Sequence, residues 1–94
     1  MTKEEAVKLY DSKFWEGMSY NDKATFQLFE KRLCMPFDIF QEAVEKTLGR
    51  PVCTHEFTEP KLLQKELLGD RPEPSFEEIM KLIPQDKQLI IVGV

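Results

Sequence analysis

The segment 20–33 constrains the fold most strongly, because it is predicted to form a helix with two apolar sides. Its apolar residues fall on nearly opposite sides: Tyr20, Ala24 and Leu28 on one, and Phe26, Phe29 and Leu33 on the other. A helix on the surface of a small protein needs only one apolar stripe. We therefore expect this helix to lie at the centre of the fold or, alternatively, to contact a partner with its second side.

Helical spacing of apolar residues predicts four further helices, at residues 3–16, about 36–48, about 60–68 and about 75–83. Their ends carry residues typical of helix caps and stops: Gly17, Ser19, Pro36, Gly49, Thr58, Gly69, the capping box of Ser75 and Glu78, and Pro84. Their apolar stripes are expected to face the core: Ala6, Val7, Tyr10 and Phe14; Phe37, Phe40, Val44 and Leu48; Leu62, Leu63 and Leu67; and Phe76, Ile79, Met80 and Ile83.

Two short segments are predicted to be extended. Residues 51–54 begin with Pro51 and cannot continue a helix, and residues 89–92 are apolar and rich in β-branched side chains. A lone strand leaves its backbone groups unpaired, so we expect these two segments to pair with each other. The predicted fold class is α+β and mostly helical, with four to five short helices and a minimal two-stranded sheet in a single domain, residues 1–94.

Size and charge exclude several function classes. The 94 residues suffice for one core, and the 41% of hydrophobic residues argue against disorder. The formal charge of −4 is spread evenly and includes no basic block, which disfavours nucleic-acid binding. No apolar run is long enough to cross a membrane, and two cysteines do not make a disulfide framework. These features predict a cytoplasmic protein with free thiols.

The segment from Cys53 to Glu56 is the first candidate for chemistry, because it holds the only histidine beside a thiol and a carboxylate. Cys53 and His55 are weak candidates for metal ligands, since a zinc site needs four. Cys34 could instead pair with His55 as a nucleophile, with Asp38 or Glu56 orienting the ring. The structural alternative makes both cysteines small packing residues.

No other catalytic pattern is found. The paired acids Glu4-Glu5 and Glu77-Glu78 occupy first-turn positions, where a negative charge stabilises a helix. The four glycines are isolated and form no phosphate-binding loop. We therefore expect a protein that is not an enzyme and that uses no cofactor.

Aromatic residues are the candidates for a protein-binding surface: Trp15, Tyr20, Phe26 and Phe29. Trp15 falls off the apolar stripe of its helix, and Phe26 and Phe29 lie on the second side of the central helix. Tryptophan and tyrosine are enriched at binding hot spots. Alternatively, Trp15 covers the corner between the first two helices.

One part of the chain resembles a group of small proteins encoded in tailed-phage and prophage genomes. The resemblance covers roughly residues 24–68 and is most specific at the run Gly49-Arg50-Pro51-Val52-Cys53-Thr54-His55-Glu56-Phe57. That group has no assigned activity, so no functional residue is carried over. The resemblance implies a phage-encoded accessory protein that acts inside a bacterial cell.

The sequence therefore predicts a small non-enzymatic accessory protein that binds and modulates, by inhibition, a host or phage protein. Two alternatives stay open. One is a structural homo-dimer or larger homo-oligomer, joined through residues 89–92 or through the central helix. The other is a metal- or thiol-dependent activity around Cys53 and His55.

Overall fold

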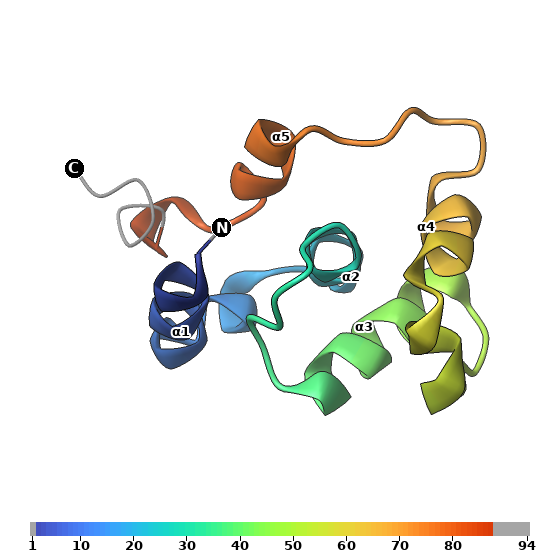
Figure 1. Cartoon of the computed structure of the whole chain (residues 1–94), viewed down its shortest axis with the longest axis horizontal. Helices are drawn as coiled ribbons and strands as arrows, with labels where there is room; N and C mark the ends of the chain where they lie inside the picture. The colour runs from blue at the N-terminus through green and yellow to red at the C-terminus, as the bar shows by residue number, and fades with distance from the viewer. Residues whose placement is uncertain (1, 88–94) are drawn as a thin grey trace.

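Helix α2 (Tyr20–Leu28) lies at the centre of the computed structural model, which describes residues 2–87 (Figure 1). It packs against α3 (Phe37–Leu48), α4 (Pro60–Leu68) and α5 (Phe76–Met80). Helix α1 (Lys3–Ser12) and two 3-10 helices, η1 (Phe14–Gly17) and η2 (Thr54–Thr58), complete the elements, and residues 85–87 are again helical. The prediction that the two-sided helix is central is confirmed.

Most of the predicted helix ends are confirmed, because their signals are local. The Ser19 hydroxyl accepts the Asp22 backbone N–H at 3.1 Å, and Ser75 and Glu78 form the predicted capping box. Gly49 ends α3 in the left-handed region with φ 73°, which a residue without a Cβ adopts at little cost. Gly69 ends α4 with a positive φ of 60° but with ψ −119°, outside the left-handed helical conformation of Gly49.

Four helix boundaries differ from the prediction, one of them in α5, which ends at Met80 rather than just before Pro84. Helix α1 ends at Ser12, since Lys13 adopts φ 55° and starts the separate turn η1. Helix α2 ends at Leu28 rather than continuing to residue 33. The residue that precedes α4 is Glu59, and the predicted cap Thr58 instead donates its hydroxyl to the His55 carbonyl oxygen at 2.7 Å.

The predicted two-stranded sheet is wrong, because residues 2–87 contain no strand. Within the extended residues 51–53, Val52 satisfies both of its backbone groups through side chains of α3. The Val52 N–H donates to Glu45 Oε2 at 2.9 Å, and the Val52 carbonyl oxygen accepts from Gln41 Nε2 at 2.8 Å. A neighbouring strand is therefore not needed. The other predicted strand, residues 89–92, lies outside the described residues, and the described fold is helical rather than α+β.

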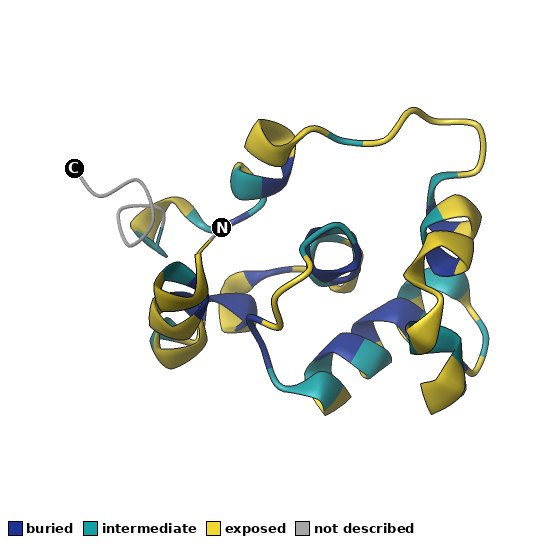
Figure 2. Ribbon diagram, in the orientation of Figure 1, coloured by how far each residue is buried: buried dark blue, intermediate teal, exposed yellow. Residues whose placement is uncertain are grey.

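The core surrounds α2 and takes buried residues from all five α-helices (Figure 2). Helix α1 turns Ala6 and Leu9 inward, whereas Val7 and Tyr10 of its predicted stripe are exposed. The left-handed Lys13 explains the difference, because it breaks the helical register before Phe14. Phe14 then reaches the core from η1, and the Val7–Tyr10 side of α1 stays on the surface. In the part of the chain described, no helix combines the length and the apolar character that a membrane span requires.

Candidate functional site

The four predicted binding residues divide into two buried and two accessible side chains. Phe26 is 0% exposed and Trp15 is 8% exposed, so the expectation that Phe26 lies on an open side of the second helix is wrong. Phe14 contacts both rings edge to face, at centroid distances of 5.2 Å to Phe26 and 5.9 Å to Trp15. Tyr20 is 44% exposed, and Phe29 is half-buried.

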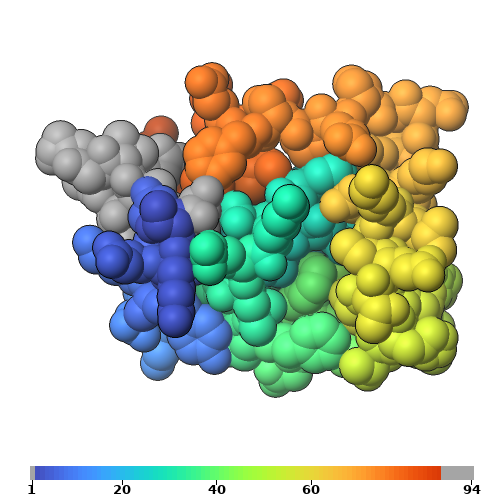
Figure 3. Space-filling model, in the orientation of Figure 1, coloured from blue at the N-terminus to red at the C-terminus, as the bar shows by residue number. Residues whose placement is uncertain are grey.

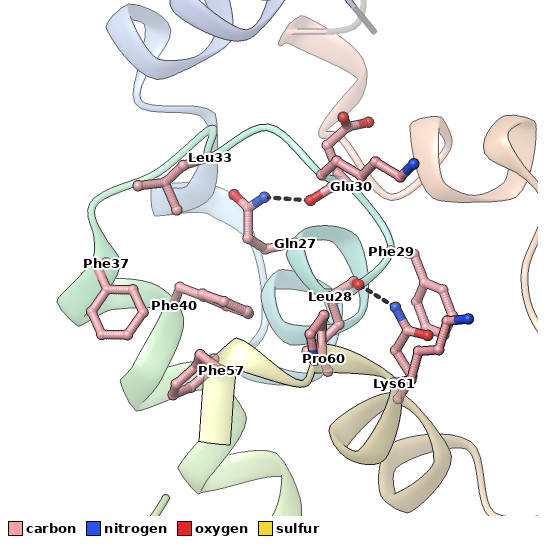
Figure 4. Close-up of a pocket in the computed structure, with 12 residues that line it drawn as sticks. Gln27, Leu28, Phe29, Glu30, Leu33, Phe37, Phe40, Phe57, Pro60 and Lys61 are labelled. Atoms are coloured by element: carbon pink, nitrogen blue, oxygen red, sulfur yellow. Dashed lines mark hydrogen bonds between the residues drawn. The ribbon is translucent and has the colours of Figure 1, made fainter. Parts of the chain in front are cut away.

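Phe29 leads to a hollow of about 370 Å³ between α2, the start of α3, η2 and the start of α4, which we call the aromatic groove (Figure 4). The groove is mostly apolar, and a few polar and charged side chains stand around it. Its lining residues are Gln27, Leu28, Phe29, Glu30, Lys31, Leu33, Phe37, Phe40, Phe57, Pro60, Lys61 and Gln64.

Three phenylalanine rings form the floor of the groove (Figure 4). Phe57 lies 5.0 Å from Phe37 and 5.0 Å from Phe40, and Phe37 lies 6.2 Å from Phe40, all edge to face. Phe40 is buried, whereas Phe37 and Phe57 keep part of their surface accessible. Edge-to-face packing of this kind adds about 0.5–1.5 kcal/mol per pair beyond the burial of area. The floor is therefore a fixed apolar surface rather than a loose collection of rings.

The side chain of Gln27 shapes the rim of the groove by holding the chain that leaves α2. Its Nε2 donates to the carbonyl oxygens of Glu30 at 3.1 Å and Arg32 at 2.8 Å. Its Oε1 accepts the Cys34 backbone N–H at 2.8 Å. Gln27 is itself 5% exposed, so these bonds are made in a largely dry place. The result is a fixed turn that carries Leu33, whose side chain is 49% exposed above the aromatic floor (Figure 4).

A second glutamine ties α4 to the same groove. Gln64 Nε2 donates to the carbonyl oxygen of Leu28, the last residue of α2, at 2.6 Å (Figure 4). The carbonyl groups at a helix C-terminus have no partner within the helix, and this bond satisfies one of them. Two side-chain amides thus fix both walls of the groove.

A second hollow, of about 470 Å³, adjoins the aromatic groove beside α1, and we call it the α1 hollow. Its lining residues are Lys3, Ala6, Val7, Tyr10, Asp11, Lys31, Arg32 and Leu33. Lys31 and Leu33 line both hollows. Figure 3 shows teal and green atoms of the chain between α1 (blue) and α4 (yellow) on this face of the molecule. The two hollows therefore adjoin one another at Lys31 and Leu33.

The segment around His55 has a structural role in this fold, because hydrogen bonds connect it to the neighbouring helices. Arg50 forms two hydrogen bonds with the Glu66 carboxylate, both at 2.8 Å, and a third with Glu56 Oε1 at 3.0 Å. The guanidinium holds the pKa of both carboxyls below their ordinary value. Glu56 also accepts the Cys53 backbone N–H at 2.8 Å. The network joins the end of α3 to η2 and α4, and it keeps Phe57 in the floor of the groove.

The predicted thiol and metal candidates are not brought together as a site. Cys34 is 0% exposed, and burial raises the pKa of its thiol to about 12, so it is not a thiolate at neutral pH. Cys53 and His55 are exposed, and no disulfide joins the two cysteines. Among residues 2–87, no three His, Cys, Asp or Glu side chains are grouped so that they could hold a metal ion.

Sequence reasoning missed the groove because its parts come from four separate segments. Phe37 and Phe40 were assigned to the core, and Leu33 was placed on a helix that ends before it. Lys31 and Lys61 carried no signal at all. One feature of the sequence did indicate part of the groove. Phe57 lies only three residues before the helix start at Pro60, so its ring is expected near the beginning of α4.

Comparison with known proteins gives one match. Residues 20–82 match the family described as a domain of unknown function (DUF7736), and this range contains every residue that lines the aromatic groove. No curated protein and no solved structure matches the chain. The match covers more than half of the chain, so the chain belongs to the DUF7736 family.

Proposed function

We propose that this member of the DUF7736 family is a non-enzymatic protein-binding module that uses the aromatic groove to dock a segment of a partner protein. The observation that carries the proposal is Leu33, a large apolar side chain held 49% exposed over a floor of three phenylalanine rings. Burying such side chains yields about 25 cal/mol for each Å² of apolar surface removed from water. An exposed leucine beside the partly accessible rings of Phe37 and Phe57 is therefore a surface that gains free energy when covered.

The groove is also pre-organised, which favours binding. Gln27 fixes the turn that carries Leu33, and Gln64 fixes the opposite wall through Leu28. A partner then does not have to order these segments on binding, and ordering costs about 0.5–1.5 kcal/mol for each immobilised side chain. The arrangement resembles a typical interface, with an apolar centre and the charged side chains of Lys31 and Lys61 at its edge.

The biological setting of the proposal rests on the resemblance of Gly49–Phe57 to small proteins of phage and prophage genomes. We assign the chain to the cytoplasm of a bacterial host, as a phage accessory protein that inhibits a host or phage protein. The geometry supports this role in one respect. A protein of this size can inhibit by covering a surface on its partner, which requires a docking groove and no catalytic group.

Affinity capture from a bacterial lysate tests the binding function, with two exposed leucines as a matched pair. Leu33→Asp places a charge in the aromatic groove, and Leu62→Asp places the same charge on α4, where Leu62 is 61% exposed and does not line the groove. Both variants should fold, which circular dichroism checks. We expect wild type and Leu62→Asp to capture the same protein, and Leu33→Asp to capture about tenfold less of it.

Two outcomes of the capture would contradict the proposal. In the first, both aspartate variants capture the partner as well as wild type does, which excludes the groove. In the second, the captured protein is another copy of the same chain. The groove would then be a homo-oligomer interface and not a binding site for a different protein.

A further inference from the structure

We infer that the segment which docks in the groove is an acidic, amphipathic peptide that places one apolar side chain on either side of Leu33. This inference rests on the proposed function and specifies the chemistry of the partner. It follows from the continuity of the two hollows, from the charge around them and from the packing of the aromatic rings.

The continuity of the surface favours a chain segment over a compact ligand. The aromatic groove and the α1 hollow have volumes of about 370 and 470 Å³, and they meet at Lys31 and Leu33. A small molecule would fill one hollow and leave the other open. An amphipathic helix presents apolar anchors at intervals of three or four residues along one side. Such a segment can place one anchor against Phe37 and Phe57 and the next against Val7 and Tyr10.

The charge around the surface is opposite in sign to the charge of the rest of the chain. The two hollows are lined by four basic residues, Lys3, Lys31, Arg32 and Lys61, and by two acidic ones, Asp11 and Glu30. The remaining residues comprise nine basic and fifteen acidic side chains, since the whole chain has 13 and 17. A net charge of +2 thus surrounds the docking surface of a protein whose remainder carries −6.

The two acidic residues are already included in this net charge of +2, and one of them, Glu30, is also engaged within the turn. Glu30 accepts the Arg32 backbone N–H at 3.2 Å, so part of its carboxylate is already engaged within the turn. Lys31 and Lys61 are exposed and lie at the aromatic groove itself. Charges at the edge of an interface select partners of complementary sign more than they raise affinity. An acidic peptide is therefore the occupant that this edge selects.

Single-stranded nucleic acid is the other anionic polymer, and the rings do not suit it. Base stacking needs an accessible aromatic face. Here the three rings of the floor pack edge to face against one another at 5.0–6.2 Å, and the most buried of them, Phe40, is 7% exposed.

Selection from a random peptide library tests the inference directly. The library displays peptides of about 12 residues, roughly three helical turns. The baits are wild type, Leu33→Asp, and the charge reversal Lys31→Glu with Lys61→Glu. Lys46→Glu with Lys65→Glu is the matched control, because these two exposed lysines line neither hollow.

We expect wild type and the control to enrich peptides with at least two large apolar residues and a net negative charge. Binding of these peptides should fall about tenfold or more with Leu33→Asp and with the charge-reversed bait, which should enrich basic peptides instead. Enrichment of neutral or basic apolar peptides that require Leu33 would overturn the inference and leave the proposed function standing. Absence of enriched peptides, or peptides indifferent to Leu33→Asp, would overturn both, and so would displacement of the selected peptides by an oligothymidine.

Discussion

The Oε1 atom of Gln27 in α2 accepts the backbone N–H of Cys34, seven positions later in the chain, at 2.8 Å. The same side-chain amide donates to the carbonyl oxygens of Glu30 and Arg32. One buried side chain thus replaces the backbone pairing that a helix or sheet would have provided to this turn. The position of Leu33 at the aromatic groove depends on it.

Gln27→Leu should destabilise the protein by about 3 kcal/mol, because it removes three hydrogen bonds at a buried position. Urea unfolding followed by the fluorescence of the buried Trp15 measures the change in free energy. Gln64→Leu is the control, since Gln64 makes one hydrogen bond, to the Leu28 carbonyl oxygen, and should cost about 1 kcal/mol. Equal costs for the two variants would mean that Gln27 does not hold the turn.

The Arg50 network should make the stability of the protein depend on pH. The pKa values of Glu56 and Glu66 are lowered in the folded state, mainly by hydrogen bonds from Arg50. Their contribution is therefore fully present above their ordinary pKa of 4.5 and is lost as the pH falls through the lowered values. We expect Arg50→Gln to be less stable than wild type at about pH 7, and the difference to shrink towards about pH 3.

Arg71→Gln is the control for this experiment. Arg71 donates to the carbonyl oxygens of Leu67 and Leu68 and forms no ion pair with a carboxylate among the contacts described. Its effect on the free energy of unfolding, measured in urea, should be the same at both pH values. A difference between Arg50→Gln and wild type that does not change with pH would exclude the network as the cause.

The two thiols should differ sharply in reactivity. Cys34 is fully buried and the pKa of its thiol is raised to about 12, whereas Cys53 is exposed. Because the thiolate is the reactive form, Ellman's reagent should modify one thiol promptly in the folded protein and both in urea. Cys53→Ser should remove the prompt reaction. A prompt reaction of Cys34 would contradict its burial and would revive a thiol-dependent activity.

The helices and most of their ends could be predicted from the sequence because their causes are local. Ser19, Gly49 and the pair Ser75 and Glu78 act on backbone groups within four residues of themselves. The presence or absence of a sheet could not be predicted from such local signals. Whether Val52 needs a neighbouring strand depends on Glu45 and Gln41, whose side chains reach it only after α3 has formed.

The candidate site was predicted in part. Phe29 was proposed from the sequence and lines the groove, whereas Trp15 and Phe26 lie in the core. A 3.6-residue pattern predicts which side of a helix a residue occupies only as long as the helix continues. The left-handed Lys13 and the end of α2 at Leu28 interrupt the helices, so the pattern does not apply beyond them. Leu33 became a surface residue through the hydrogen bonds of Gln27, and no periodicity encodes them.

Photo-crosslinking in living bacteria tests the central claim most directly. A benzoylphenylalanine replaces Leu33 in one variant and the exposed Leu62, outside the groove, in the control. The account predicts that light joins the chain to a second protein from position 33 and not from position 62. A crosslink from position 62 with none from position 33, or none from either, would contradict the assignment of the aromatic groove as the binding surface.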